Sequence, residues 1–91
     1  MKKHLKLTLH GDVRHTGVRF SIMQKAYQLA ITGNATYSDN GKKLIIHAEG
    51  NDLPLKTFIE YCSRGLYELN IEKQHVEELP PENFPSFDLI S

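Results

Sequence analysis

Hydrophobic and polar residues alternate at the start of the chain and then change to a helical spacing. Leucines at positions 5, 7 and 9 are separated by single polar residues, which is the period of a half-buried strand. From residue 20 to residue 32 the apolar side chains recur every three or four positions and form one stripe of a helix. We expect Gly33 to end that helix, because glycine readily adopts the left-handed conformation found at helix C-termini.

The rest of the pattern predicts short extended segments and one further helix. Residues 39–42 read Asp-Asn-Gly-Lys and have hairpin-turn chemistry, since asparagine and glycine tolerate a positive φ. Asn51 is expected to cap the second helix, with Pro54 in its first turn and an end near Gly65. The expected strands are residues 5–9, 35–38, 44–48, 69–76 and 87–90, with a break at Pro80 and Pro81.

This order of elements is strand, helix, strand, strand, helix, strand, which predicts an α+β fold. Two strand–helix–strand units of this kind pack both helices on one face of a four-stranded antiparallel sheet, the ferredoxin-like architecture. Residues 87–90 would add a short extra C-terminal strand. Residues 1–91 are expected to form a single domain without linker or repeat.

Composition narrows the classes of function. Eleven basic residues balance eleven acidic ones, and this zero net charge argues against a protein that holds nucleic acid by its phosphates. A single cysteine allows no internal disulfide and fits a reducing compartment. The sequence has no apolar run of membrane-spanning length and no signal-peptide core, so we expect a cytoplasmic protein. No apolar stripe is left over after the core is assigned, and a monomer is expected.

The other chemistry-bearing residues have structural interpretations. His4, His10 and His47 lie on predicted strands and are expected on the exposed face. Their spacing does not match a zinc site, which uses close pairs of histidine or cysteine. Cys62 lies on the apolar stripe of the second helix and is expected in the core.

The segment 11–20 between the first strand and the first helix is the strongest candidate for a binding site. It contains Gly11 and Gly17, two arginines and a histidine. Glycines allow backbone N–H groups to turn toward a common centre, and the following helix adds the positive end of its dipole. Such a loop is suited to an oxyanion, above all a phosphate.

Residues 5–90 resemble the acylphosphatase family along their whole length. The family's loop reads Gly-x-Val-Gln-Gly-Val-x-Phe-Arg, and Gly11, Val13 and Arg19 stand in register with it, with Gly17 at its variable position. Further matches are Ala26, Leu29, Thr32-Gly33, Asp39 near Gly41, Ala48-Glu49-Gly50, and Phe87 before Leu89. The resemblance implies a ferredoxin-like enzyme that hydrolyses carboxyl–phosphate mixed anhydrides, such as acetyl phosphate, without metal or cofactor.

The resemblance also implies roles for particular residues. In the family, loop amides and one arginine hold the phosphoryl group, and an asparagine on the second strand orients the attacking water. Arg19 matches that arginine, and its planar guanidinium suits two phosphoryl oxygens at once. The expected substrate-binding residues, which would supply the backbone donors, are Arg14, His15, Thr16, Gly17 and Val18.

The chain departs from the family pattern at the position of the asparagine that orients the attacking water. The asparagine lies eighteen residues after the arginine, and the same count from Arg19 reaches Tyr37. A tyrosine hydroxyl stands at the tip of a long ring and would overshoot a water held by a short amide. Arg14, His15 and Thr16 also replace the family's glutamine, glycine and valine. These changes predict a phosphate-binding loop of altered shape and impaired hydrolysis.

Two functions remain open, and a third is set aside. The chain is either an acylphosphatase with impaired activity or an inactive relative that keeps an anion-binding or interaction site. Arg14 and His15 could equally be plain exposed loop residues, and Tyr37 is expected to be a surface aromatic of the sheet. A ferredoxin-like nucleic-acid binder would show exposed aromatics on its central strands and a basic face, and the sequence has neither. Whether residues 77–85 cover the site is left open.

Overall fold

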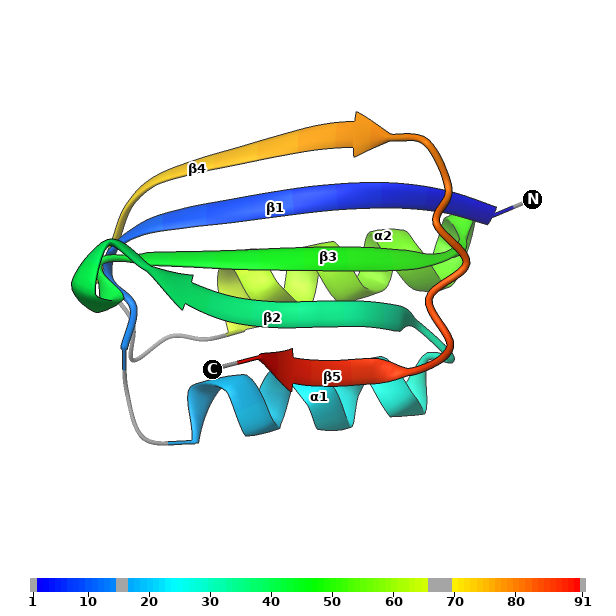
Figure 1. The fold of residues 1–91 in the computed structure, drawn as a ribbon, viewed down its shortest axis with the longest axis horizontal. Helices are drawn as coiled ribbons and strands as arrows, with labels where there is room; N and C mark the ends of the chain where they lie inside the picture. Colours follow the sequence, from blue (N-terminus) through cyan, green and yellow to red (C-terminus); the bar gives the residue numbers. More distant parts are fainter. Residues whose placement is uncertain (1, 15–16, 66–69, 91) are drawn as a thin grey trace.

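A computed structural model describes residues 2–14, 17–65 and 70–90. Among these residues, no helix is long and apolar enough to cross a membrane. The strands and helices follow the predicted order (Figure 1). The strands are β1 (Lys2–Asp12), β2 (Thr32–Ser38), β3 (Lys43–Asn51), β4 (Asn70–Leu79) and β5 (Phe87–Ile90). The helices are α1 (Val18–Gln28) and α2 (Asp52–Glu60), with a 3-10 turn η1 (Asp39–Gly41) and a π-helical turn η2 (Tyr61–Gly65).

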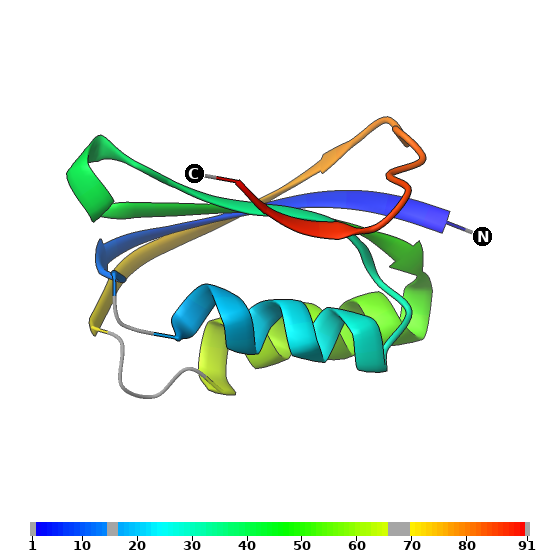
Figure 2. The same ribbon diagram turned by 60° about the horizontal axis from the view of Figure 1, so that its bottom comes forward.

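The strands form one five-stranded sheet in the order β4-β1-β3-β2-β5, and both helices lie on one face of it (Figure 2). Strands β1 to β4 pair antiparallel, as in the predicted ferredoxin-like arrangement. The prediction of a four-stranded antiparallel sheet is wrong, because the expected extra strand, β5, joins the same sheet and pairs parallel to β2, which makes the sheet five-stranded and mixed. The segment 80–86 causes this: it crosses the end of the sheet and delivers Phe87 beside Gly33, so both strands start from the same end.

The core lies between the sheet and the helices. Alternate residues of the central strands, such as Leu7, Leu9 and Ile46, are buried against the helices, as the period of two predicts. Phe58 of α2 meets Phe87 edge to face at a centroid distance of 5.7 Å, which ties β5 to the core. Cys62 is buried there, as expected, and burial raises the pKa of its thiol.

Helix α1 is shorter than the apolar stripe predicts. It ends at Gln28, and the left-handed residue that follows is Ala30 with φ 57°, whereas Gly33 already belongs to β2. The amide of Ile31 donates to the carbonyl of Ala26 and closes the helix end. Gly33 has a different requirement: a Cβ there would lie 1.8 Å from the carbonyl oxygen of His47 on the next strand. It permits close strand pairing and does not stop the helix.

The second helix also ends early. Helix α2 stops at Glu60, and η2 carries the chain on to Gly65, where the sequence pattern had placed the helix end. Asn51 stands at the N-cap position, but its side chain makes no capping hydrogen bond. The predicted break at Pro80 and Pro81 is confirmed, since β4 ends at Leu79.

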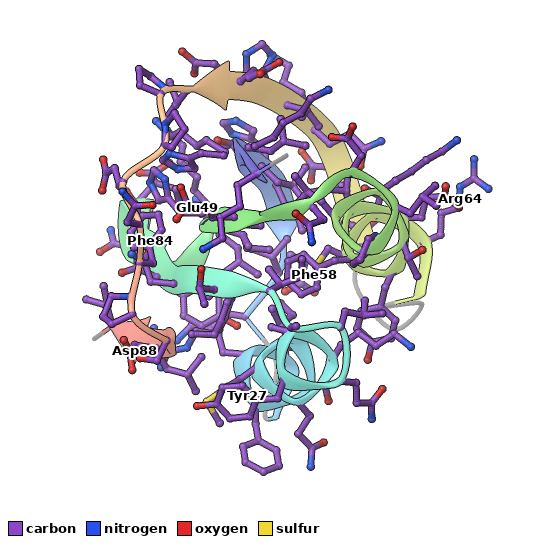
Figure 3. The ribbon with its side chains drawn as sticks, turned by 90° about the vertical axis from the view of Figure 1, so that its right-hand side faces the viewer. Tyr27, Glu49, Phe58, Arg64, Phe84 and Asp88 are labelled. Carbon is purple, nitrogen blue, oxygen red and sulfur yellow. The ribbon has the colours of Figure 1, made fainter. Side chains whose placement is uncertain are left out.

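The face of the sheet away from the helices carries a buried polar cluster at one end. The Glu49 carboxylate accepts hydrogen bonds from the amides of Glu82 and Phe84, each at 2.9 Å. The His4 ring contacts the carbonyl oxygen of Pro80 through Nδ1 and the Nδ1 atom of His47 through Nε2, at 2.9 and 2.8 Å. Figure 3 shows Glu49 beside Phe84 of this crossing segment.

The prediction that His4 lies exposed is therefore wrong. His4 and Glu49 are completely buried and His47 is partly buried, because the segment 80–86 covers this end of the sheet. Strand alternation places these side chains on the polar face correctly. It carries no information about a later loop that folds back over that face.

Candidate functional site

The candidate loop leaves β1 at the end of the sheet where η1 joins β2 to β3 (Figure 1). The amide of Gly11 donates to the carbonyl of Lys42 at 2.9 Å, and Val13 is completely buried. These contacts fix the point at which the chain leaves the sheet and turns toward α1. His15 and Thr16, two of the predicted substrate-binding residues, lie outside the described part of the chain.

The N-terminus of α1 has the features expected for an anion-binding helix end. Gly17 precedes it with φ 82°, a conformation that favours glycine, and a Cβ at this position would meet nothing within 4 Å. The amide of Ser21 makes the first helical bond, to the carbonyl of Gly17. The amides of Val18 and Arg19 precede that bond, so they have no acceptor within the helix. Within the described part of the chain, the first turn of α1 holds no acidic residue, and no side chain caps the helix at Gly17.

Arg19 is held in place on two sides. Its Nη1 atom donates a 2.7 Å hydrogen bond to the carbonyl oxygen of Ile90 on β5. Its guanidinium carbon also lies 5.0 Å from the centre of the Tyr37 ring, within range of a cation–π interaction. The side chain is partly buried, and these two contacts leave further guanidinium N–H donors for a ligand.

Tyr37 lies at the centre of the cluster. It pairs with Leu44 on the helix face of β2, it is partly buried, and it packs against the core, so it is not the surface aromatic that we expected. Its hydroxyl donates to the carbonyl oxygen of Val13 at 3.0 Å. This bond connects the second strand to the start of the candidate loop.

Arg14 reaches the same tyrosine from the loop. Its guanidinium carbon lies 5.9 Å from the Tyr37 ring centre, and its side chain is exposed. The aliphatic part packs over Gly41 of η1, where a Cβ would come within 2.6 Å of Cδ of Arg14. Gly41 is also left-handed, with φ 85°. Because Gly41 has no side chain, the stem of Arg14 can pack directly against the hairpin turn.

The structure brings Arg14, Arg19 and Tyr37 together, and it places Gly17 and Val18 at the start of α1 beside them. Sequence reasoning missed two contributors. The carbonyl of Ile90 carries no side-chain signal and could not be found from the pattern. The pattern predicted the turn that contains Gly41, but it did not predict that Arg14 packs over this glycine.

The residues from 77 to 85 do not cover this loop. Residues 77–79 are part of β4, and the following segment is fixed to Glu49 and His4. His4 pairs with Glu49 near the start of β1, whereas the loop follows the other end of that strand. In Figure 1 the crossing segment and the loop lie at opposite ends of the sheet. Among the described residues, no group of three or more histidine, cysteine or acidic side chains is placed to hold a metal ion.

A sequence profile of the acylphosphatase family matches residues 5–89. The chain belongs to this family. An acylphosphatase of Thermotoga petrophila is 30% identical over 87 residues, covering 96% of each chain. The acylphosphatase of Caldanaerobacter subterraneus is 38% identical over 66 residues, which is 72% of each chain.

Solved structures share the acylphosphatase fold. The crystal structure of the Bacillus subtilis acylphosphatase superposes with a TM-score of 0.87 at 23% identity and full coverage of both chains. Full-length HypF, crystallised in a phosphate- and nucleotide-bound form, contains a matching region with a TM-score of 0.86 at 18% identity. That region is 12% of the HypF chain and corresponds to all of this one.

Proposed function

We propose that this protein binds the phosphoryl group of acyl phosphates in the loop between β1 and α1 and hydrolyses them slowly. In the reaction, a water oxygen forms a bond to phosphorus and the bridging P–O bond breaks. The electron pair leaves with the carboxylate, and the proton of the water passes to the released phosphate or to solvent. The substrate class follows from membership of the acylphosphatase family.

The observation that carries this proposal is the fixed position of Arg19 at the N-terminus of α1. A guanidinium held by Ile90 and Tyr37 loses little freedom when it binds, because its orientation is already set. The amides of Val18 and Arg19, which have no acceptor within the helix, would face the same anion. Phosphoryl transfer requires mainly such positioning and charge balance from a protein.

The slow rate is proposed from Tyr37. In our alignment with the family loop it occupies the position of the water-orienting asparagine, and it offers no short amide there. Its hydroxyl donates to Val13, so its one proton is already engaged. The ring supports the two arginines and leaves the attacking water without the donor–acceptor pair that an asparagine would provide.

The same observation favours a second candidate function, an anion-binding relative without turnover. If no other group positions the water, the cluster would hold a phosphate-like ligand and release it unchanged. The two candidates share the site and differ only in whether catalysis survives.

Steady-state hydrolysis of acetyl phosphate tests the proposal. Tyr37→Asn is expected to raise kcat by about tenfold or more, because a positioned water lowers the entropic cost of attack, and to raise KM as well, because Arg19 loses the ring that orients it. Arg19→Ala is expected to lower kcat/KM by about a hundredfold or more through loss of charge stabilisation. Arg64→Ala, which removes an exposed arginine of η2, serves as the control and should change neither value.

Two results would contradict the proposal. Rapid native turnover that Tyr37→Asn leaves unchanged or lowers would remove the impairment attributed to Tyr37. Turnover that survives Arg19→Ala would place the reaction elsewhere. Saturable phosphate binding without native turnover, with activity gained in Tyr37→Asn, would favour the second candidate.

A further inference from the structure

A polar hollow of about 560 Å³ adjoins the candidate loop at the end of the sheet. It lies between the end of β1, the turn η1 and the start of β4, and all the residues that line it are polar, charged or glycine. The charged residues and the histidine among them are His10, Asp12, Arg14, Asp39, Lys42 and Glu72.

Arg14 connects this hollow to the phosphoryl site. Its guanidinium approaches the Tyr37 ring to 5.9 Å, its stem packs over Gly41, and the same residue lines the hollow. Both arginines approach the Tyr37 ring, so a phosphoryl group held by Arg19 would lie near Arg14, which also lines the hollow. The acyl part of an acyl phosphate is the portion of the substrate that extends beyond the phosphoryl group.

The lining indicates which acyl groups suit the hollow. An alkyl or aromatic acyl group would find mostly polar surface there and would gain little from burial. Charged groups of both signs line it, with Arg14 and Lys42 against Asp12, Asp39 and Glu72. An acyl group with a single charge would meet repulsion as well as attraction, whereas one with an ammonium and a carboxylate can match both signs.

We infer that the hollow is the acyl subsite of this protein and selects acyl phosphates whose acyl group carries both an ammonium and a carboxylate. This inference rests on the proposed function, because it needs the phosphoryl group to bind at Arg19. It assigns the specificity to two residues outside the phosphoryl-binding loop. These are Lys42, which directly follows η1, and Glu72 of β4.

Two substrates of equal carbon number test it. β-Aspartyl phosphate and butyryl phosphate both have four-carbon acyl chains, and only the first carries the two charges. We expect kcat/KM for β-aspartyl phosphate to exceed that for butyryl phosphate by about tenfold, after subtraction of spontaneous hydrolysis. Acetyl phosphate, whose acyl group is too short to fill the hollow, reports on the phosphoryl site alone. Isothermal titration calorimetry with the same compounds gives the affinities if turnover is slow.

Variants of the lining separate the subsite from general charge effects. Lys42→Gln and Glu72→Gln should each lower kcat/KM, or affinity, for β-aspartyl phosphate by about three- to fivefold and leave acetyl phosphate unchanged. Lys56→Gln on α2 and Glu77→Gln on β4 make the same charge changes at exposed positions away from the hollow, and should have no effect.

The outcomes distinguish a failure of the acyl subsite from a failure of the proposed function. If acetyl phosphate is bound or hydrolysed through Arg19 but β-aspartyl and butyryl phosphate are equivalent, the subsite is wrong and the proposed function stands. The same holds if the lining variants leave β-aspartyl phosphate unaffected. If acetyl phosphate is neither bound nor hydrolysed, the proposed function fails and this inference fails with it.

Discussion

The guanidinium of Arg19 lies 5.0 Å from the centre of the Tyr37 ring, eighteen positions later in the chain. The same ring is 5.9 Å from the guanidinium of Arg14, and its hydroxyl binds the carbonyl of Val13. One aromatic side chain thus contacts both arginines and the start of the loop. Tyr37 is therefore a structural support of this cluster.

Removal of the Tyr37 hydroxyl tests this support directly. Tyr37→Phe keeps the ring beside both guanidinium groups and loses the bond to Val13. We expect the free energy of unfolding to fall by about 1 kcal/mol, the usual net value of such a bond, as measured by urea denaturation. Tyr27→Phe, which removes a hydroxyl that donates to Phe87 beside the start of β2, is the matched control for loss of a tyrosine bond. Phosphate affinity should fall in Tyr37→Phe and remain unchanged in the control.

Gly41 and Arg14 form a second testable pair. Gly41→Ala places a Cβ within 2.6 Å of Cδ of Arg14 and forces a side chain onto a backbone with φ 85°. We expect a loss of about 2 kcal/mol, of which about 1 kcal/mol comes from the left-handed backbone. In the double variant with Arg14→Ala the steric part should disappear, since Cδ is gone. Equal losses with and without the Arg14 side chain would show that the two residues do not press on each other.

Glu49 should make the protein sensitive to strong acid. Burial works to raise the pKa of this carboxyl, but the backbone amides of residues 82–84 outweigh it and hold the pKa below its ordinary 4.5. A depressed folded pKa contributes stability that is present above the unfolded value and is lost as pH falls below 4.5 through the folded value. Glu49→Gln should cost about 2 kcal/mol at pH 7 and abolish that part of the acid dependence. An unchanged acid profile in Glu49→Gln would contradict the assignment.

His47 should affect the stability of the fold at higher pH than Glu49 does. Burial, His4 and the facing Lys6 lower the pKa of His47 from 6.5, while Glu82 works in the opposite direction. The folded state therefore favours the neutral ring, and stability is complete above pH 6.5 and falls as the unfolded chain takes up a proton below it. His47→Asn keeps a polar group that can hydrogen-bond to Nε2 of His4 and should flatten the stability profile between pH 7 and 5. His75→Asn, at an exposed position of β4, should leave the profile as it is.

The sequence predicted the order of the elements, and it singled out residues that the structure places close together, for identifiable physical reasons. Strand alternation placed Leu7 and Leu9 in the core, because the side-chain period of a strand is fixed. The register of the family pattern placed Arg19 and Tyr37 on neighbouring elements, and the structure brings them into contact.

The features that were missed depend on contacts between distant segments. The burial of His4 requires the segment 80–86, and the anchor of Arg19 is a main-chain carbonyl of Ile90, which no side-chain pattern encodes. The parallel direction of β5 depends on the path of that same segment across the sheet. Gly33 was assigned to a helix end because local propensity cannot reveal that His47 approaches it from the next strand.

The central claim is that the loop and Arg19 receive a phosphate-like anion, and a titration of labelled protein with inorganic phosphate tests it most directly. In amide chemical-shift maps, we expect saturable shifts concentrated at residues 13–19, weakened by added salt and lost in Arg19→Ala. Shifts that do not saturate, or that centre on the segment 80–86 and survive in Arg19→Ala, would contradict the claim.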